Sequence, residues 1–137
     1  MATFSKFESF VEALAEGNID FDDSDIKIAL SNTAPTLATD DTFADITEIS
    51  AGNGYTAGGA TLGSKTSSQT SGTYTGDGAD VTFTASGGSI GPFRYIIVYD
   101  ATTGYLMGTL DYGSGLTLNN GDSFEVRWNA SGLLTIT

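Results

Sequence analysis

The sequence contains neither cysteine nor histidine. Without cysteine, a disulfide framework and a thiolate metal site are both impossible. Without histidine, the chain lacks the commonest general base and the commonest metal ligand. Its many serine and threonine hydroxyls could be activated only by lysine or a carboxylate. We therefore expect no enzyme activity, no catalytic residues and no bound cofactor.

Basic residues are scarce: five of them stand against 17 acidic residues, and the formal net charge is −12. The five are scattered along the sequence, as Lys6, Lys27, Lys65, Arg94 and Arg127. A protein that binds nucleic acid through phosphates needs a basic surface. We therefore expect neither nucleic acid nor an anionic membrane as a partner, whereas a basic protein surface would suit this chain.

Long apolar runs are also missing, and none approaches the length of a bilayer span. The N-terminal segment is not typical of a signal peptide, because Glu8 and Glu12 interrupt its apolar residues. We expect synthesis in the cytoplasm without classical export. The length of 137 residues, with no linker or internal repeat, predicts one domain over residues 1–137.

Residues 1–17 are the one segment with a helical pattern. Ser5 and Glu8 have the spacing of a capping box, and Gly17 is a natural helix end. One apolar stripe is formed by Phe4, Phe7, Phe10, Val11 and Leu14. We expect this amphipathic helix, through Phe7, Phe10 and Leu14, to pack on the body of the domain or to bind a partner.

After Gly17 the apolar period changes from 3.6 to 2, which is typical of strands. Residues 92–100 are apolar enough for a central strand that forms a hairpin with 104–113, whereas residues 32–53 look irregular. The other predicted strand segments are 25–31, the polar pair within 66–76, 80–86, 123–129 and 133–137. This pattern predicts an all-β fold, an antiparallel β-sandwich of jelly-roll type with one N-terminal helix.

A glycine-rich stretch, GNGYTAGGATLG at residues 52–63, contains the dinucleotide-binding pattern G-x-G-x-x-G/A at Gly52, Gly54 and Ala57. That pattern binds pyrophosphate only where a helix begins directly after the glycines. The residues that follow are β-prone and rich in glycine, serine and threonine. We therefore predict that the loop turns the chain, that Tyr55 anchors it by packing, and that it binds no nucleotide.

Carboxylates are concentrated in DFDDSD at residues 20–25. The order is that of an EF-hand loop at its first positions, but Asp25 stands where glycine is needed and Ser31 where glutamate is needed. An EF-hand is excluded. Asp20, Asp22 and Asp25 are weak candidates for a looser calcium site, against the simpler interpretation as a solvated acidic turn, and we predict no metal.

Two further patterns suggest enzymes or sugar binding. A glycosidase needs two facing carboxylates, but Asp111 and Glu125 both fit the solvent face of their strands. Aromatic side chains could form a sugar-stacking platform, although core and cross-strand packing is the commoner role. The candidates for that platform are Trp128, Tyr95, Tyr99, Tyr105 and Tyr112.

Several stretches together resemble a family of small virion proteins of tailed bacteriophages. They include DIKIALSNTAP, GYTAGG at residues 54–59, FRYIIVYD at 93–100, the DYG segment and the terminal strand pair at 128–137. The resemblance covers nearly the whole chain. It implies a structural part of the particle, most plausibly a head decoration or cement protein, and it implies no catalytic residues.

The expected function is thus a virion protein on the outer capsid surface that bridges major capsid subunits and stabilises the head. The resemblance implies the major capsid protein and further copies of the chain, with a trimer favoured, as partners. Two alternatives stay open. One is a tail, baseplate or head-fibre component with an adhesin-like role, and the other is a carbohydrate-binding module.

Overall fold

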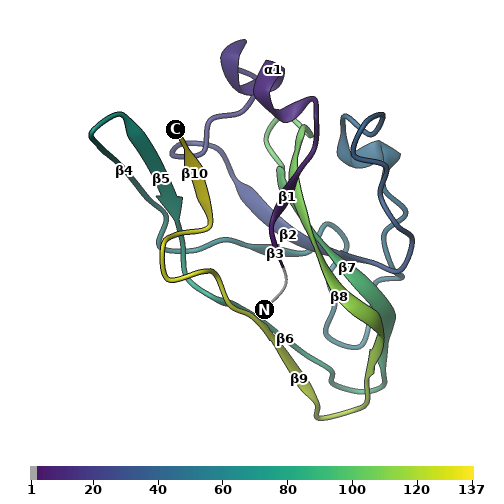
Figure 1. The fold of residues 1–137 in the computed structure, drawn as a ribbon. Helices are drawn as coiled ribbons and strands as arrows, with labels where there is room; N and C mark the ends of the chain where they lie inside the picture. Colours follow the sequence, from purple (N-terminus) through teal and green to yellow (C-terminus); the bar gives the residue numbers. More distant parts are fainter. Residues whose placement is uncertain (1–2) are drawn as a thin grey trace.

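The computed structural model describes residues 3–137, and most of its regular structure is antiparallel strand (Figure 1). The prediction of an all-β chain is confirmed. The largest sheet has five strands in the order β1-β8-β7-β2-β3. Their bounds are Ser5–Lys6 for β1, Leu106–Leu118 for β8, Ile90–Asp100 for β7, Ile26–Ser31 for β2 and Ala60–Thr61 for β3.

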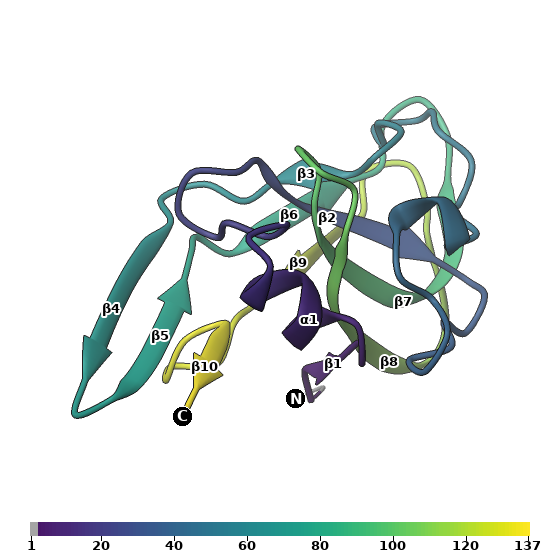
Figure 2. The same ribbon diagram turned by 90° about the horizontal axis from the view of Figure 1, so that it is seen from above.

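Two smaller sheets complete the fold. One pairs β6 (Val81–Thr84) with β9 (Ser123–Val126), and the other has the order β10-β5-β4. The strands of that second sheet are β10 (Leu134–Ile136), β5 (Thr73–Asp77) and β4 (Thr66–Thr70). The β4–β5 hairpin extends away from the rest of the chain (Figure 2). The predicted hairpin of residues 92–113 is confirmed as β7 and β8, with β7 at the centre of its sheet.

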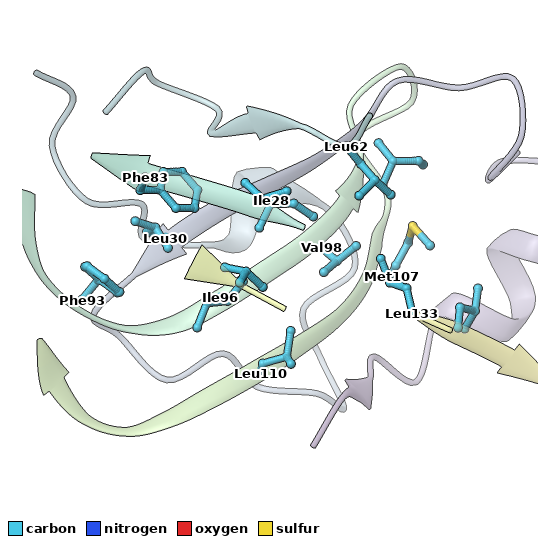
Figure 3. Close-up of a cluster of buried hydrophobic side chains, with 14 of the residues drawn as sticks. Ile28, Leu30, Leu62, Phe83, Phe93, Ile96, Val98, Met107, Leu110 and Leu133 are labelled. Carbon is cyan, nitrogen blue, oxygen red and sulfur yellow. The ribbon is translucent and has the colours of Figure 1, made fainter. Parts of the chain in front are cut away.

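The main core lies on one face of the five-stranded sheet (Figure 3). Alternate side chains of β2 and β7, such as Ile28, Leu30 and Val98, meet Phe83 of β6 there. These side chains are almost wholly buried. Burying a large aliphatic or aromatic side chain contributes roughly 1.5–3 kcal/mol, so this face supplies most of the hydrophobic stabilisation.

The opposite face of the same sheet is covered as well. Ala29, Ile97 and Leu106 form a second buried cluster there with Phe7. The cover comes from the irregular residues 32–53, which contain a short 3-10 helix, η1 (Phe43–Asp45). The ring of Phe43 stacks on that of Tyr99, with centroids 4.0 Å apart. Because both faces are covered, β2 is buried on two sides, although an alternation such as that of residues 25–31 is typical of a half-buried strand.

The N-terminal segment differs from its prediction. The helix α1 is short, Phe10–Ala15, and it begins after Ser9, whose side chain makes no capping hydrogen bond. Ser5 belongs instead to β1, where it pairs with Thr109 of β8. The Ser5–Glu8 capping box is therefore wrong, because pairing with a sheet edge outweighs a local helix signal. The first two residues of the predicted helix lie outside the described residues.

The apolar stripe is divided between the two cores. Phe7 is fully buried in the second cluster, whereas Phe10 is 2% exposed and lies in the main core. The segment thus packs on the body through Phe7 and Phe10, which is the first of its two predicted roles, and a role in binding a partner stays a prediction. Leu14 is partly exposed. Within residues 3–137, no helix has the length and apolar character to cross a membrane.

Candidate interaction surface

The glycine-rich loop is held to the strands of the five-stranded sheet by hydrogen bonds. Tyr55 is buried, donates its hydroxyl hydrogen to Glu48 Oε2 at 2.6 Å and accepts the backbone N–H of Leu30 at 3.0 Å. The same Glu48 oxygen accepts the backbone N–H of Gly58, whose carbonyl accepts the hydroxyl of Tyr99. Burial, followed by the hydrogen bond to Glu48, raises the pKa of Tyr55 well above its usual value.

Two glycines of this loop are required by close backbone contacts. A Cβ on Gly59 would lie 2.0 Å from the carbonyl oxygen of Ile28, and one on Gly54 would lie 2.3 Å from that of Thr84. The glycines at residues 52–59 are followed by β3 and not by a helix. The prediction that the loop turns the chain and is anchored by Tyr55 is confirmed, and the helix N-terminus that a dinucleotide site requires does not follow it.

In the acidic turn at residues 20–25, the carboxylate of Asp20 binds the backbone of the turn itself. Asp20 Oδ1 accepts the N–H groups of Asp22 and Asp23, both at 3.1 Å. The N–H of Asp20 donates to the buried Asp100. Across residues 3–137, no three carboxylates are grouped as a metal ion would need. The weak calcium candidates Asp20, Asp22 and Asp25 are therefore not brought together as a site.

The other sequence candidates are dispersed. Asp111 and Glu125 both lie on the surface, as predicted, and each faces an arginine: Arg94 at 2.8 Å and Arg127, respectively. The aromatic candidates do not form one exposed platform. Tyr99 is buried beneath Phe43, whereas Tyr112 is half-exposed and contacts the edge of Phe124.

The most exposed regular structure is the arm, defined here as residues 66–76 of the β4–β5 hairpin (Figure 2). All five residues of β4 are exposed, and the arm carries no charged side chain in a chain of net charge −12. Its two-residue turn places Ser71 and Gly72 at positive φ. Such turns match the twist of the strands, so the arm has the geometry of a preformed hairpin.

An apolar groove of about 400 Å³ lies beside the arm, between it and α1. Leu14 of the helix, Tyr74 of the arm and Ile136 of β10 contribute partly exposed apolar side chains. Asp20 and Asp22 also line it. We call this the helix groove. Of the three predicted partner residues, Phe10 and Leu14 line this groove, and Leu14 is the more exposed of the two.

A second groove, of about 660 Å³, lies between two strand edges, β1 and β10. Phe4 and Lys6 line one side of this edge groove, and residues 131–135 line the other. Arg127 also borders it, so it holds two of the five basic residues of the chain. The ring of Phe4 fits there because Gly108 has no side chain to fill its place.

Comparisons of the chain with models of protein families, with curated proteins and with solved structures find no match. The structural evidence for an interaction surface is therefore the geometry of the residues that form it. Sequence patterns alone did not locate the grooves, because the walls of each come from several separate segments of the chain. The uncharged run at 66–76 was the one local signal of the arm.

Proposed function

We propose that the chain is a structural protein of a tailed-bacteriophage virion that binds the outer capsid surface and bridges major capsid subunits. The resemblance of the sequence to small phage virion proteins suggests this role. The described residues support it in a second way, since their exposed features include an uncharged arm and two grooves that could bind other protein surfaces.

The observation that carries the proposal is the helix groove. Apolar side chains form its floor, and Asp20 and Asp22 lie with them in a strongly acidic chain. An extended or helical segment with apolar and basic side chains would bury the floor and neutralise the carboxylates. We assign this segment to the major capsid protein.

The mechanism is bridging. A chain that contacts two capsid subunits at once adds its binding free energy to the work needed to separate them. Many symmetry-related copies multiply the effect without requiring a strong single contact. The strong negative charge keeps the free protein soluble before assembly and steers it toward basic surfaces.

The arrangement of the sheets as a β-sandwich is part of the same proposal. We assign the five-stranded sheet to one layer of a β-sandwich and the β6–β9 pair to the other, because both contribute to the main core. The jelly-roll order of strands stays a prediction.

The test uses phage heads that lack the protein. Added wild-type chain should co-sediment with these heads, appear on their outer surface by electron microscopy and raise the temperature at which they release DNA. Leu14→Lys, which places a cation in the helix groove, should weaken binding at least ten-fold. Val11→Lys is the matched control on the same helix, because Val11 is 51% exposed and does not line the groove. Absence of wild-type binding, or a location in the tail alone, would refute the proposal.

A further inference from the structure

The outer edge of β4 is unprotected. In the described part of the chain, β4 pairs with β5 alone and without a bulge, so its other edge has no strand partner. Natural proteins usually protect such an edge with lysine, proline or a bulge, since it is a template for another strand. The side chains of β4 are Thr66, Ser67, Ser68, Gln69 and Thr70, which offer no such protection.

The register shows which backbone groups of β4 are free. Thr70 pairs with Thr73 next to the two-residue turn, and such a closing pair exchanges both hydrogen bonds. Because bonded and non-bonded pairs alternate, Ser68 also bonds to β5, whereas the N–H and C=O groups of Ser67 and Gln69 point outward. Two residues thus offer unpaired donors and acceptors along the edge.

The opposite edge of the same sheet is β10, which pairs only with β5 among the described strands. Thr135 stands opposite Thr75, and Thr75 already directs its N–H and C=O groups toward Ser68. The alternation then turns the corresponding groups of Thr135 away from β5 and into the edge groove, which Thr135 lines.

We propose that β4 of one copy pairs in parallel with β10 of a second copy, in the edge groove. Within one chain, β4 and β10 are both antiparallel to β5 and therefore run in the same direction. Joining them between copies continues the sheet without turning it over. Ser68 of one copy then stands opposite Thr135 of the next, flanked by the outward groups of Ser67 and Gln69, as a parallel ladder requires.

Electrostatics favour a second copy as the occupant. Most contacts between copies of net charge −12 are repulsive. The arm carries no charge, and the residues that line the edge groove include Lys6 and Arg127 and no carboxylate, so this contact sets no carboxylate against another. Because the two edges differ, the contact is head-to-tail, and it closes into a ring when the rotation per copy permits. The inference rests on the proposed function only in expecting the copies to assemble.

A disulfide test is direct because the chain has no cysteine of its own. We make two single variants, Ser68→Cys and Thr135→Cys. In one chain these positions are separated by β5, about 10 Å from strand to strand, which is beyond disulfide reach. A mixture of the two variants should form linked dimers on mild oxidation, and neither variant should do so alone. No linkage in the mixture, or linkage of Ser68→Cys to itself, would overturn the proposal.

A second measurement uses the outward N–H of Gln69. Gln69→Pro removes this donor, whereas Gln69→Ala keeps it. Sedimentation should show assembled wild type and Gln69→Ala, with Gln69→Pro shifted to monomer and an unchanged circular dichroism spectrum. Assembly of Gln69→Pro at the wild-type concentration would contradict the pairing. A monomeric wild type that still coats heads overturns the pairing alone, whereas rings that ignore heads overturn the proposed function alone.

Discussion

The strand β7 and the strand β4 are opposites within one chain. Residues 96–100 of β7 are buried, with side chains directed alternately into two cores, whereas all five residues of β4 are exposed. β7 has a strand on either side, and β4 has one. The contrast teaches that buried apolar side chains and unpaired backbone groups lie in different parts of the molecule. The edge of the arm can therefore bind another strand without disturbing the packing of the core.

The difference also explains why the two regions depend on different chemistry. In the body, tight packing and glycine contacts fix the sheet against its loops, as Gly59 against Ile28 shows. In the arm, the strand β4 has only exposed polar side chains and ends in a two-residue turn, and Tyr74 of β5 packs against the main core. Substitutions in the body should therefore change stability, and substitutions in the arm should change association.

The largest effect is expected at Phe10, which is 2% exposed in the main core. Phe10→Ala should lower the free energy of unfolding by roughly 3–5 kcal/mol, because it removes buried surface and leaves a cavity. Its neighbour Val11 is 51% exposed, so Val11→Ala should change that free energy by less than about 0.5 kcal/mol. Urea unfolding of both variants measures the difference. Equal effects at the two positions would show that the segment does not pack on the body.

The next effect concerns the glycine loop. Gly59→Ala introduces a methyl group 2.0 Å from the backbone oxygen of Ile28 at a φ of +87°. Gly17→Ala is a matched control, since its φ is +77° and nothing lies within 4 Å of the added carbon. The control should cost about 1–2 kcal/mol from φ alone. Thermal melts should show a clearly larger loss for Gly59→Ala, and equal losses would mean that the loop contact gives way freely.

A smaller loss is expected at Tyr55. Tyr55→Phe removes the hydroxyl that bridges Glu48 and the buried N–H of Leu30. Leaving these groups unsatisfied should cost about 1–3 kcal/mol. Tyr112→Phe is the control, because Tyr112 is half-exposed and its ring contacts the edge of Phe124 at the surface. An unfolding midpoint in urea that is the same for both variants would contradict the fastening role of the loop.

Alkaline pH should weaken the same loop. Burial raises the pKa of Tyr99 to about 12, and that of Tyr55 is raised further. Both folded-state values lie above the ordinary value of about 10, so the neutral phenols stabilise the fold below pH 10. This stabilisation should be lost as pH rises from about 10 through 12. Melting temperatures across that range should fall, and the fall should be shallower in Tyr55→Phe. A wild-type melting temperature that stays constant from pH 10 to pH 12 would contradict the stabilisation by the two neutral phenols.

Local patterns were sufficient to predict most strands. The period-2 alternation at 80–86 placed β6, and the apolar run at 92–100 placed β7 as a central strand. The prediction of a helix over the whole N-terminal segment was wrong because long-range contacts determine its structure. Phe7 and Phe10 have helical spacing, but they enter different cores, and Ser5 gains hydrogen bonds from Thr109, more than 100 residues away.

The interaction surface was harder to predict than the fold. The sequence indicated Leu14 as a contact residue, but it gave no sign that Tyr74 and Ile136 would meet it in the helix groove. It likewise did not reveal that the edge of β10 opens into a groove beside Lys6. Grooves and free edges result from strand order, which depends on contacts between distant segments and leaves no periodic pattern in the sequence.

The smallest expected effect lies in the turn of the arm. Ser71 has a φ of +51°, a region that asparagine adopts more readily than serine, and Gly72 follows it. Ser71→Asn should stabilise the hairpin by a few tenths of a kcal/mol, which would slow amide hydrogen exchange in the arm by roughly two-fold.

The body should not respond to the same substitution. If the arm opens independently, amides of β7 keep their exchange rates and the thermal midpoint of Ser71→Asn stays at the wild-type value. Ser71→Ala provides the opposite control, because alanine disfavours positive φ and should speed exchange in the arm alone. If both substitutions shift the exchange of β7 together with that of β4, the arm and the body form one cooperative unit. The separation of stability from association drawn between these two strands would then be wrong.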